Sequence, residues 1–408
     1  MEFKRETLDN GLDIIAEINP DTYSAAIGFF VRAGSRDETD EIAGASHFLE
    51  HMLFKGTPRR TAEDVNRELD EMGGYSNAFT TEEMTVYFAA VLPELQTRAV
   101  DLLTDILRPS LRNTDFETEK KVVLEEIKMY EDQPPFGVDE KCRELFFEGH
   151  PLFRSVLGTP DSVGGLTVER MREYFSRRYS PGSIVAVACG NLDFDRFVSD
   201  INERCGKWKP EDAPRELWRP VGKPGKKVYV RPSAIQEYVF LLSDAPCVRD
   251  EDRYAAAILA NVMGDDVGSR LFWELVDNGR ADCASLGFCD FLDAGYFSTT
   301  LCCSPETAAE NVQVIRNIFD GVMADGIGED ELDRAKNKLL SRLVVSSERA
   351  RGRLFYVGNE WLQTGEYFPI QADIEIVKSM TVDKIASMIK KYTLVPKLAV
   401  AVGPCEDI

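Results

Sequence analysis

The stretch Gly44-Ala45-Ser46-His47-Phe48-Leu49-Glu50-His51-Met52-Leu53-Phe54-Lys55-Gly56-Thr57 sets the expectations for the rest of the chain. It is apolar and free of proline, and Gly56 stands where a helix C-cap is expected, so it predicts a largely buried helix. On that helix His47 and His51 project from one face, four residues apart, with Glu50 beside them. Two neutral imidazoles at this spacing are half of a zinc site, and the carboxylate can take a proton from a metal-bound water.

The scarcity of histidine favours the metal interpretation. The chain has three histidines in 408 residues, and two of them lie in this pentapeptide with a glutamate. A lone histidine on an apolar face is usually an ordinary core residue. A buried cluster of two imidazoles and a carboxylate, however, costs free energy unless a metal or another partner satisfies it. The stretch therefore predicts a metal site.

Composition excludes several classes of partner. Asp and Glu number 70 against 48 Lys and Arg, for a net charge of −22, which argues against binding to nucleic acid or to an anionic membrane. The cysteines form no C-x-x-C pair and are typical of free thiols in a reducing compartment. The N-terminus lacks the apolar segment of a signal peptide, and no stretch reaches membrane-spanning length. We therefore expect a cytoplasmic protein with no membrane partner.

The order of elements predicts an α+β chain made of two homologous α/β-sandwich domains. Proline and charge concentrate in a connector that we place at residues 211–225. An N-terminal, zinc-binding catalytic domain would then occupy residues 1–210, and a homologous, non-catalytic domain would occupy residues 226–408. Each domain is expected to pack its helices on one face of a mixed or antiparallel sheet.

Internal similarity supports this duplication. The helix predicted after Pro93 has a counterpart after Pro305, and the helix predicted at 116–127 has a counterpart at 332–342. The two halves differ where chemistry is expected, because the second half contains no histidine. We therefore assign the chemistry to the first half.

Two histidines leave a tetrahedral metal short of a third protein ligand. The helix predicted from about Asp115 to Met129 offers four glutamates, namely Glu117, Glu119, Glu125 and Glu126. Glu119 and Glu126 are seven residues apart, on the face that also carries Val122 and Val123, so at least one of them is expected to point inward. Spacing alone does not choose among the four, and solvated charges are the alternative.

Together, the motifs of this chain resemble those of the pitrilysin or insulinase family of zinc metallopeptidases, whose H-x-x-E-H order inverts the commoner H-E-x-x-H. The resemblance spans nearly the whole chain and is closest to the small bacterial processing proteases and the β subunit of the mitochondrial processing peptidase. Besides residues 47–57, it rests on Leu8-Asp9-Asn10-Gly11-Leu12, Ala33-Gly34-Ser35-Arg36-Asp37-Glu38, Gly73-Gly74 through Asn77-Ala78, Val122-Val123-Leu124-Glu125-Glu126-Ile127, His150-Pro151-Leu152 and Leu157-Gly158-Thr159.

The resemblance implies a role for each candidate residue. His47, His51 and Glu126 would hold one Zn²⁺ ion per chain, and Glu50 would be the general base of catalysis. Glu119 would belong to the catalytic group as the carboxylate that supports a metal-bound histidine. In this family the substrate adds as an extra strand to the edge strand that follows the Gly-Gly turn. The candidates for substrate binding are therefore Ser76, Asn77, Ala78 and Phe79, with ordinary sheet pairing as the alternative.

The implied activity is that of a zinc metalloendopeptidase that hydrolyses peptides or unfolded protein segments. Family members enclose a chamber with four such domains, so a chain with two implies a homodimer or a paired heterodimer, with an acidic interior that favours basic peptides. One departure concerns an arginine and a tyrosine of the family's second domain, whose positions hold Val276 and Cys283 here. Losing donors to an oxyanion costs about 10²–10³ in rate. A catalytically weak or inactive scaffold subunit of a peptidase-like heterodimer is therefore the alternative, and a zinc hydrolase of a non-peptide amide is a third hypothesis.

Overall fold

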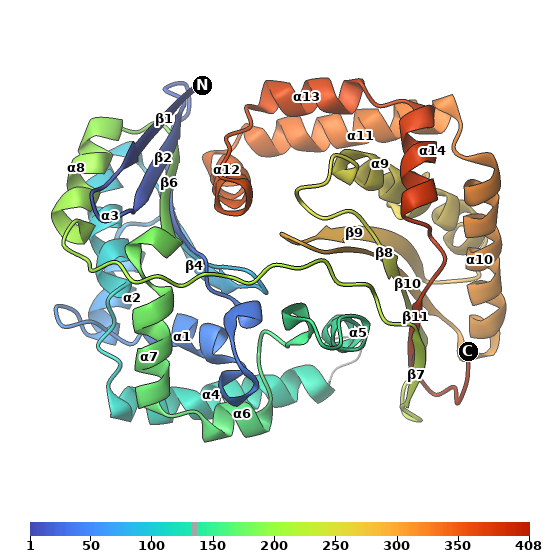
Figure 1. Cartoon of the computed structure of the whole chain (residues 1–408), viewed down its shortest axis with the longest axis horizontal. Coiled ribbons are helices and arrows are strands. Elements are labelled where there is room, and N and C mark those ends of the chain that lie inside the picture. The colour runs from blue at the N-terminus through green and yellow to red at the C-terminus, as the bar shows by residue number, and fades with distance from the viewer. Residues whose placement is uncertain (133–136) are drawn as a thin grey trace. The chain divides into compact units, whose positions relative to one another are not determined.

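A computed structural model describes residues 1–132 and 137–408 of the chain (Figure 1). The chain forms two compact units, and each unit is assembled from three stretches of sequence. Unit 1 comprises residues 1–129, 154–216 and 345–368, and unit 2 comprises residues 130–153, 217–344 and 369–408. The domain boundaries expected from composition, with a linker at 211–225, stay a prediction.

Unit 1 contains a six-stranded mixed sheet with the order β1-β2-β6-β3-β5-β4. Its strands are β1 (Glu2–Thr7), β2 (Asp13–Ile18), β3 (Ala25–Val31), β4 (Tyr75–Thr80), β5 (Thr85–Val91) and β6 (Ile184–Gly190). Strands β2 and β6 pair in parallel, and the other neighbours pair antiparallel. Strand β4 therefore lies at one edge of this sheet.

Unit 2 contains a five-stranded sheet with the order β7-β11-β8-β10-β9. Its strands are β7 (Gly225–Val230), β8 (Glu237–Asp244), β9 (Cys283–Asp290), β10 (Gly295–Cys303) and β11 (Leu398–Gly403). One parallel pair, β7 with β11, is followed by three antiparallel pairs. The series β2-β6-β3-β5-β4 of unit 1 has the same pairing pattern, so the structure confirms the predicted pair of similar α/β domains.

Helices of both units pack beside these sheets. Unit 1 contains α1 (Ala45–Leu53), α2 (Ala62–Glu71), α3 (Gln96–Ile106), α6 (Pro160–Gly165), α7 (Val168–Arg178), α8 (Phe194–Cys205), α12 (Ala350–Thr364) and most of α4 (Asn113–Asp132). Unit 2 contains α5 (Val138–Phe146), α9 (Arg253–Gly264), α10 (Ala308–Asp325), α13 (Ile370–Lys378), α14 (Val382–Lys391) and most of α11 (Glu329–Ser347).

Each sheet has an apolar cluster on both of its faces. In unit 1, helices α1 and α3 pack on the main face, and α12 covers the other with Leu354, Val357 and Trp361. In unit 2, α9 and α10 lie on the main face, and α5 covers the other with Val138 and Phe146. Helix α12 comes from the second half of the sequence and α5 from the first, so each half contributes one helix to the other half's sheet. The predicted layer of helices on one face is thus supplemented by a helix on the opposite face.

Two further features concern membrane-spanning helices and cysteines. No helix among the described residues is long and apolar enough to cross a membrane. The nine cysteines are free thiols, and five of them are buried. Their burial raises the pKa of several, for example Cys302 to about 11, so these thiols stay protonated near neutral pH.

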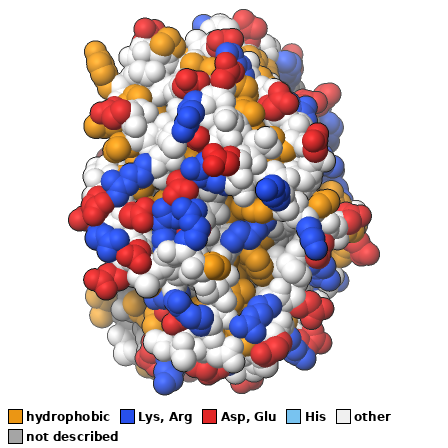
Figure 2. Space-filling view, turned by 90° about the vertical axis from the view of Figure 1, so that its left-hand side faces the viewer, with side chains coloured by type: hydrophobic (Ala, Val, Ile, Leu, Met, Phe, Trp, Pro, Cys, Tyr) orange, Lys and Arg blue, Asp and Glu red, His pale blue; other side chains and the backbone are white. Residues whose placement is uncertain are grey.

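A network of ion pairs joins the outer surfaces of α3 and α8 in unit 1, on the side of the molecule where Figure 2 shows acidic and basic side chains intermixed. Asp101 lies at its centre, with nitrogens of Arg60, Arg204 and Arg59 at 2.6, 3.0 and 3.2 Å from its carboxylate oxygens. Burial alone would raise the pKa of Asp101, but the hydrogen bonds from these arginines lower it to about 2.

The depressed pKa of Asp101 predicts a pH-dependent contribution to stability. Because the folded-state value lies below the ordinary value of 3.8, the contribution is present above about pH 4 and is lost as the pH falls through 2. With solvent screening included, we expect Asp101→Asn to lower the free energy of unfolding by about 1 kcal/mol near neutral pH. Urea unfolding at a series of pH values should show that the difference in unfolding free energy between the wild type and Asp101→Asn decreases toward zero near pH 2. A difference that does not change with pH would contradict the assignment.

Candidate metal centre

Helix α1 carries the two histidines and is anchored at its N-terminus. It begins after Gly44, whose φ of 89° is accessible mainly to glycine. The carboxylate of Glu38 accepts hydrogen bonds from the backbone N–H groups of Gly44 and Ser46, at 2.7 and 2.6 Å. These bonds satisfy donors that an isolated helix start would leave unpaired. With Phe48 and Leu49 fully buried in the core, the helix presents its histidines at a fixed place.

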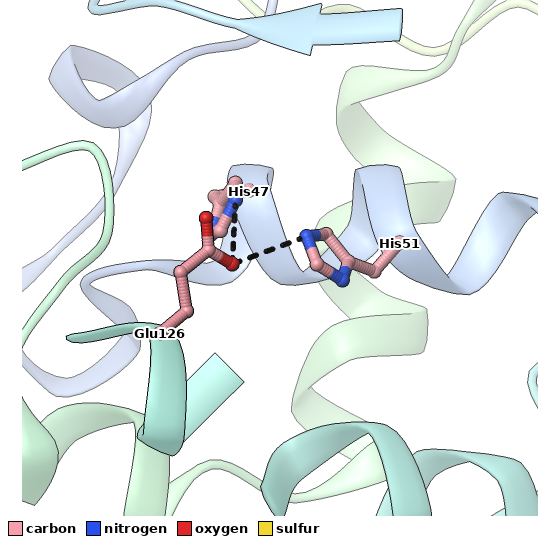
Figure 3. Close-up of side chains that lie close together, drawn as sticks. All are labelled: His47, His51 and Glu126. Atoms are coloured by element: carbon pink, nitrogen blue, oxygen red, sulfur yellow. Dashed lines mark ion pairs between the residues drawn. The ribbon is translucent and has the colours of Figure 1, made fainter. Parts of the chain in front are cut away.

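Three side chains converge beside α1 (Figure 3). The Nε2 atoms of His47 and His51 lie 3.7 and 3.6 Å from the same oxygen, Oε2 of Glu126 on α4. One potential ligand atom from each of the three residues lies within 4.8 Å of the others. Neighbouring ligands of a tetrahedral zinc ion lie about 3.4 Å apart, given metal–ligand distances of about 2.1 Å. The two measured separations are therefore close to those of a zinc site.

The protonation state of His47 also fits a metal ligand. Burial, with a smaller contribution from His51, lowers the pKa of His47 to about 3, so the ring is neutral near pH 7. A neutral imidazole is the form that binds a metal ion. Its Nδ1 atom is buried and has no hydrogen-bond partner among the described residues. One buried ring, one half-buried ring and one carboxylate, with no hydrogen bond among them, are a donor set that suits a cation.

Helix α4 separates the four candidate glutamates. Glu119 is buried and Glu126 is half-buried beside the histidines, whereas Glu117 and Glu125 face solvent near Lys120 and Lys128. Glu119 and Glu126 thus lie on the inward side, as their spacing predicts. The same argument was wrong about Val122, which is 47% exposed, because the buried stripe of α4 passes through Val123 instead.

Glu50 lies next to the histidines and is held by a strand of the sheet. Its Oε2 atom accepts a hydrogen bond of 2.6 Å from Oγ1 of Thr80, the last residue of β4. Burial raises the pKa of Glu50, while the Thr80 hydrogen bond and His51 act in the opposite direction. Its Oε1 atom has no hydrogen bond to any described residue, so it is available to take a proton.

Glu119 connects His51 to a lysine. Its Oε1 atom lies 3.0 Å from Nδ1 of His51, and its Oε2 atom lies 2.7 Å from Nζ of Lys55. A bond to Nδ1 fixes the orientation of the imidazole and leaves Nε2 facing Glu126, as is usual for metal-bound histidines. Lys55 balances the charge of the carboxylate. Glu119 therefore orients the imidazole of His51 and is not one of the three residues that converge.

This arrangement predicts that Glu119→Gln weakens metal binding. Loss of such a supporting carboxylate typically costs about 10- to 100-fold in metal affinity. Competition between the protein and a chromogenic zinc chelator measures the change, with the exposed Glu117→Gln as the matched control. An affinity unchanged in Glu119→Gln would show that His51 does not need this carboxylate.

Strand β4 borders a cavity of about 320 Å³ beside the histidine helix. Glu50 and His51 line it together with Ser76, Asn77 and Ala78. Among the described strands β4 pairs only with β5, so no strand pairs with its other edge, and the N–H of Ala78 donates instead to Oδ1 of Asn77 at 2.9 Å. Three of the four predicted substrate-binding residues therefore border the cavity. The fourth, Phe79, instead packs its ring against Phe355 of α12, at a centroid distance of 5.7 Å.

Sequence reasoning missed two residues of the site, Thr80 and Lys55. Each had a recognisable signal. Lys55 follows His51 by four residues, a spacing that puts it on the same side in the helix predicted to run to Gly56, and it lies just after the end of α1. Thr80 is two and four residues beyond Ala78 and Ser76, so all three side chains point to the same face of β4.

Unit 2 has ion pairs where unit 1 has the histidine cluster. Helices α9 and α11 follow the counterparts of β3 and β5 and correspond to α1 and α4. Asp265, just after α9, pairs with Lys338 and Arg342 of α11 at 3.2 and 2.8 Å. Charged residues of opposite sign thus hold these two helices together. Among the described residues of the chain, the cluster on α1 and α4 is the one group with metal-ligand geometry.

Comparisons with known proteins agree with this picture. Residues 13–160 match the model of the insulinase family, peptidase family M16, and residues 165–339 match the M16 inactive domain. The chain is 34% identical over 408 residues to an uncharacterised zinc protease of Mycobacterium tuberculosis (strain ATCC 25618 / H37Rv), covering 98% of this chain and 93% of the relative.

A more distant relative and a solved structure extend the comparison. The chain is 27% identical over 431 residues to a probable mitochondrial-processing peptidase subunit β of Arabidopsis thaliana, covering 100% of this chain and 79% of the relative. The crystal structure of a protease from Helicobacter pylori has the same fold, with a TM-score of 0.92 at 21% identity over 99% of both chains. The family resemblance seen in the sequence is therefore confirmed, and the chain belongs to the insulinase family of peptidases, family M16.

Proposed function

We propose that this chain is a zinc endopeptidase that hydrolyses peptides or unfolded protein segments. The observation that carries the proposal is the convergence of His47, His51 and Glu126 beside Glu50, at a cavity bordered by the free edge of β4. One Zn²⁺ ion per chain would be held by these three residues. When bound, such an ion supplies a Lewis acid that polarises a carbonyl group and acidifies a water molecule.

The chain's own residues supply the proton transfers. Glu50 would take the proton of the attacking water at Oε1 and return it to the leaving amine, while Thr80 holds Oε2 in place. The raised pKa of Glu50 brings its basicity closer to that needed near neutral pH. Glu119 would keep His51 oriented through Nδ1. Peptide hydrolysis needs each of these roles.

The edge of β4 favours an extended peptide over a small amide. A peptide added to this edge would form backbone hydrogen bonds with alternate residues of β4, beside the cavity that Ser76, Asn77 and Ala78 line, and its carbonyl groups would then lie near the metal ligands. Folded proteins rarely offer a free extended segment, so unfolded segments are the expected substrates. The net charge of −22 favours basic peptides.

Digestion of a peptide library tests this function. Mass spectrometry of the products should show internal cleavage by the zinc-loaded protein, loss of cleavage after chelation, and recovery when zinc is returned. Peptides that stay intact after incubation with the zinc-loaded protein would contradict the proposal and favour the alternative, a scaffold subunit. That alternative is supported by Val276 and Cys283, which replace the family's arginine and tyrosine. Cleavage that persists after complete chelation would contradict the metal mechanism.

We further propose a cytoplasmic homodimer or paired heterodimer. The relative from Arabidopsis thaliana is named as a probable peptidase subunit β, and this chain would supply two of the four domains that the family's chambers require. Light scattering on the purified chain measures its mass. A monomer with full activity would contradict the assembly.

A further inference from the structure

The two faces of β4 offer different surroundings to a bound peptide. Thr80, on one face, contacts Glu50, and Ser76 and Ala78 point the same way. The alternate residues, Tyr75, Asn77 and Phe79, therefore point to the opposite face. That face is covered by α12, since Phe79 lies against Phe355. A peptide strand added at this edge would alternate its side chains between the metal ligands and α12.

Helix α12 places a cation at the start of this edge. The guanidinium carbon of Arg351 lies 4.4 Å from the centroid of the Tyr75 ring. Tyr75 is 53% exposed, and Arg351 is itself only half-buried, so a solvent-exposed ligand can reach both. Added strands lie about 4.8 Å from their neighbour, and directly opposed side chains lie about 5 Å apart on the same face. The residue of a bound peptide opposite Tyr75 would thus lie within reach of Arg351.

Arg351 has no structural counter-charge. No carboxylate among the described residues pairs with it, and its contact is with the Tyr75 ring. It also lies in the first turn of α12, where no acidic residue is present. The helix dipole disfavours a cation at this end. Helix stability therefore does not account for an arginine at this position, whereas the buried Arg353 two residues later has Glu17 as its partner.

We propose that Arg351 is a specificity-determining residue that selects an acidic side chain at one position of the bound peptide. The selected residue is the one opposite Tyr75, pointing to the α12 face. Because the register on β4 is fixed, the preference falls at one constant distance from the cleaved bond. This inference rests on the proposed peptidase function. It adds a preference for one acidic side chain at a single position of peptides whose overall charge is expected to be basic.

A series of peptides in which a single glutamate is moved along a neutral parent sequence tests the proposal. The zinc-loaded wild type should cleave one member with kcat/KM about two- to fivefold above its neighbours, the range of a partly exposed ion pair. The higher kcat/KM should come from a lower KM with kcat unchanged, because the contact is the same in the ground and transition states. Arg351→Gln should remove the preference, and Arg351→Glu should transfer it to lysine at the same position.

Arg349→Gln is the matched control, because Arg349 is an exposed arginine at the N-cap of α12, and among the described cations it is Arg351 that lies over the Tyr75 ring. It should keep the preference for glutamate. Equal kcat/KM for all members of the series, with the parent peptide cleaved, would overturn the role of Arg351 and leave the peptidase function intact. A parent peptide neither cleaved by the wild type nor bound by Glu50→Gln in fluorescence anisotropy would overturn both.

Discussion

Replacing Glu50 with glutamine is expected to lower kcat for peptide cleavage by about 10²–10⁴-fold, the usual contribution of a general base. Glutamine keeps the shape of the side chain and still accepts the hydrogen bond that Thr80 donates. It cannot take a proton from the attacking water. Zinc content and peptide affinity should therefore stay close to those of the wild type, so that the loss appears in kcat. Steady-state kinetics with a quenched fluorescent peptide measures the change.

The matched control for this variant is Glu125→Gln. Glu125 is an exposed glutamate of α4 that pairs with Lys128, so the same chemical change there should leave kcat unaltered. Equal cleavage rates for the wild type and Glu50→Gln would assign the activity to a contaminant or to a different group. Poor cleavage by both, with zinc bound in both, would favour a scaffold subunit.

The second large effect is expected at a buried ion pair that holds α12 against the sheet of unit 1. Arg353 donates from Nε to Oε1 of Glu17 on β2 at 2.7 Å, and its Nη2 pairs with the other oxygen. Tyr367 donates a further hydrogen bond of 2.7 Å to Glu17. Arg353→Met would leave the carboxylate buried without its counter-charge. We expect this to lower the free energy of unfolding by about 3–5 kcal/mol.

Urea unfolding followed by fluorescence reports this change, because Trp361 lies in the same helix and is buried. A double variant, Glu17→Leu with Arg353→Met, is the control. Removing both charges together should recover most of the lost stability, since replacing a buried ion pair by apolar side chains is often close to neutral. A single variant as stable as the wild type would show that α12 is held by its apolar contacts alone.

The sequence predicted the local parts of the site well. The spacing of His47 and His51 requires one face of one helix, and the seven-residue spacing of Glu119 and Glu126 places both on the inward side of another. Residue type misled in one case: Val122 was expected to share the buried face because it is apolar, and it is exposed. Thr80 was missed because threonine at the end of a strand is common, and only the packing of β4 on α1 gives it Glu50 as a partner.

The exchange of helices between the two halves was beyond sequence reasoning. Glu17 and Arg353 are 336 positions apart in the chain. No periodic pattern relates them, and each would be read separately as a surface charge. The apolar residues of α12 carry no information in the sequence on which sheet they cover. The duplication was accessible because it repeats in the sequence, whereas the contribution of α5 and α12 to the opposite half depends on tertiary packing.

Zinc content per chain tests the central claim most directly. After exposure to zinc and removal of loosely bound metal, elemental analysis should give one ion per wild-type chain and a large loss for His47→Ala, His51→Ala and Glu126→Gln. Glu125→Gln should retain the ion. A wild-type chain that holds no zinc under these conditions, or a Glu126→Gln chain that holds it as tightly as the wild type, would contradict the account.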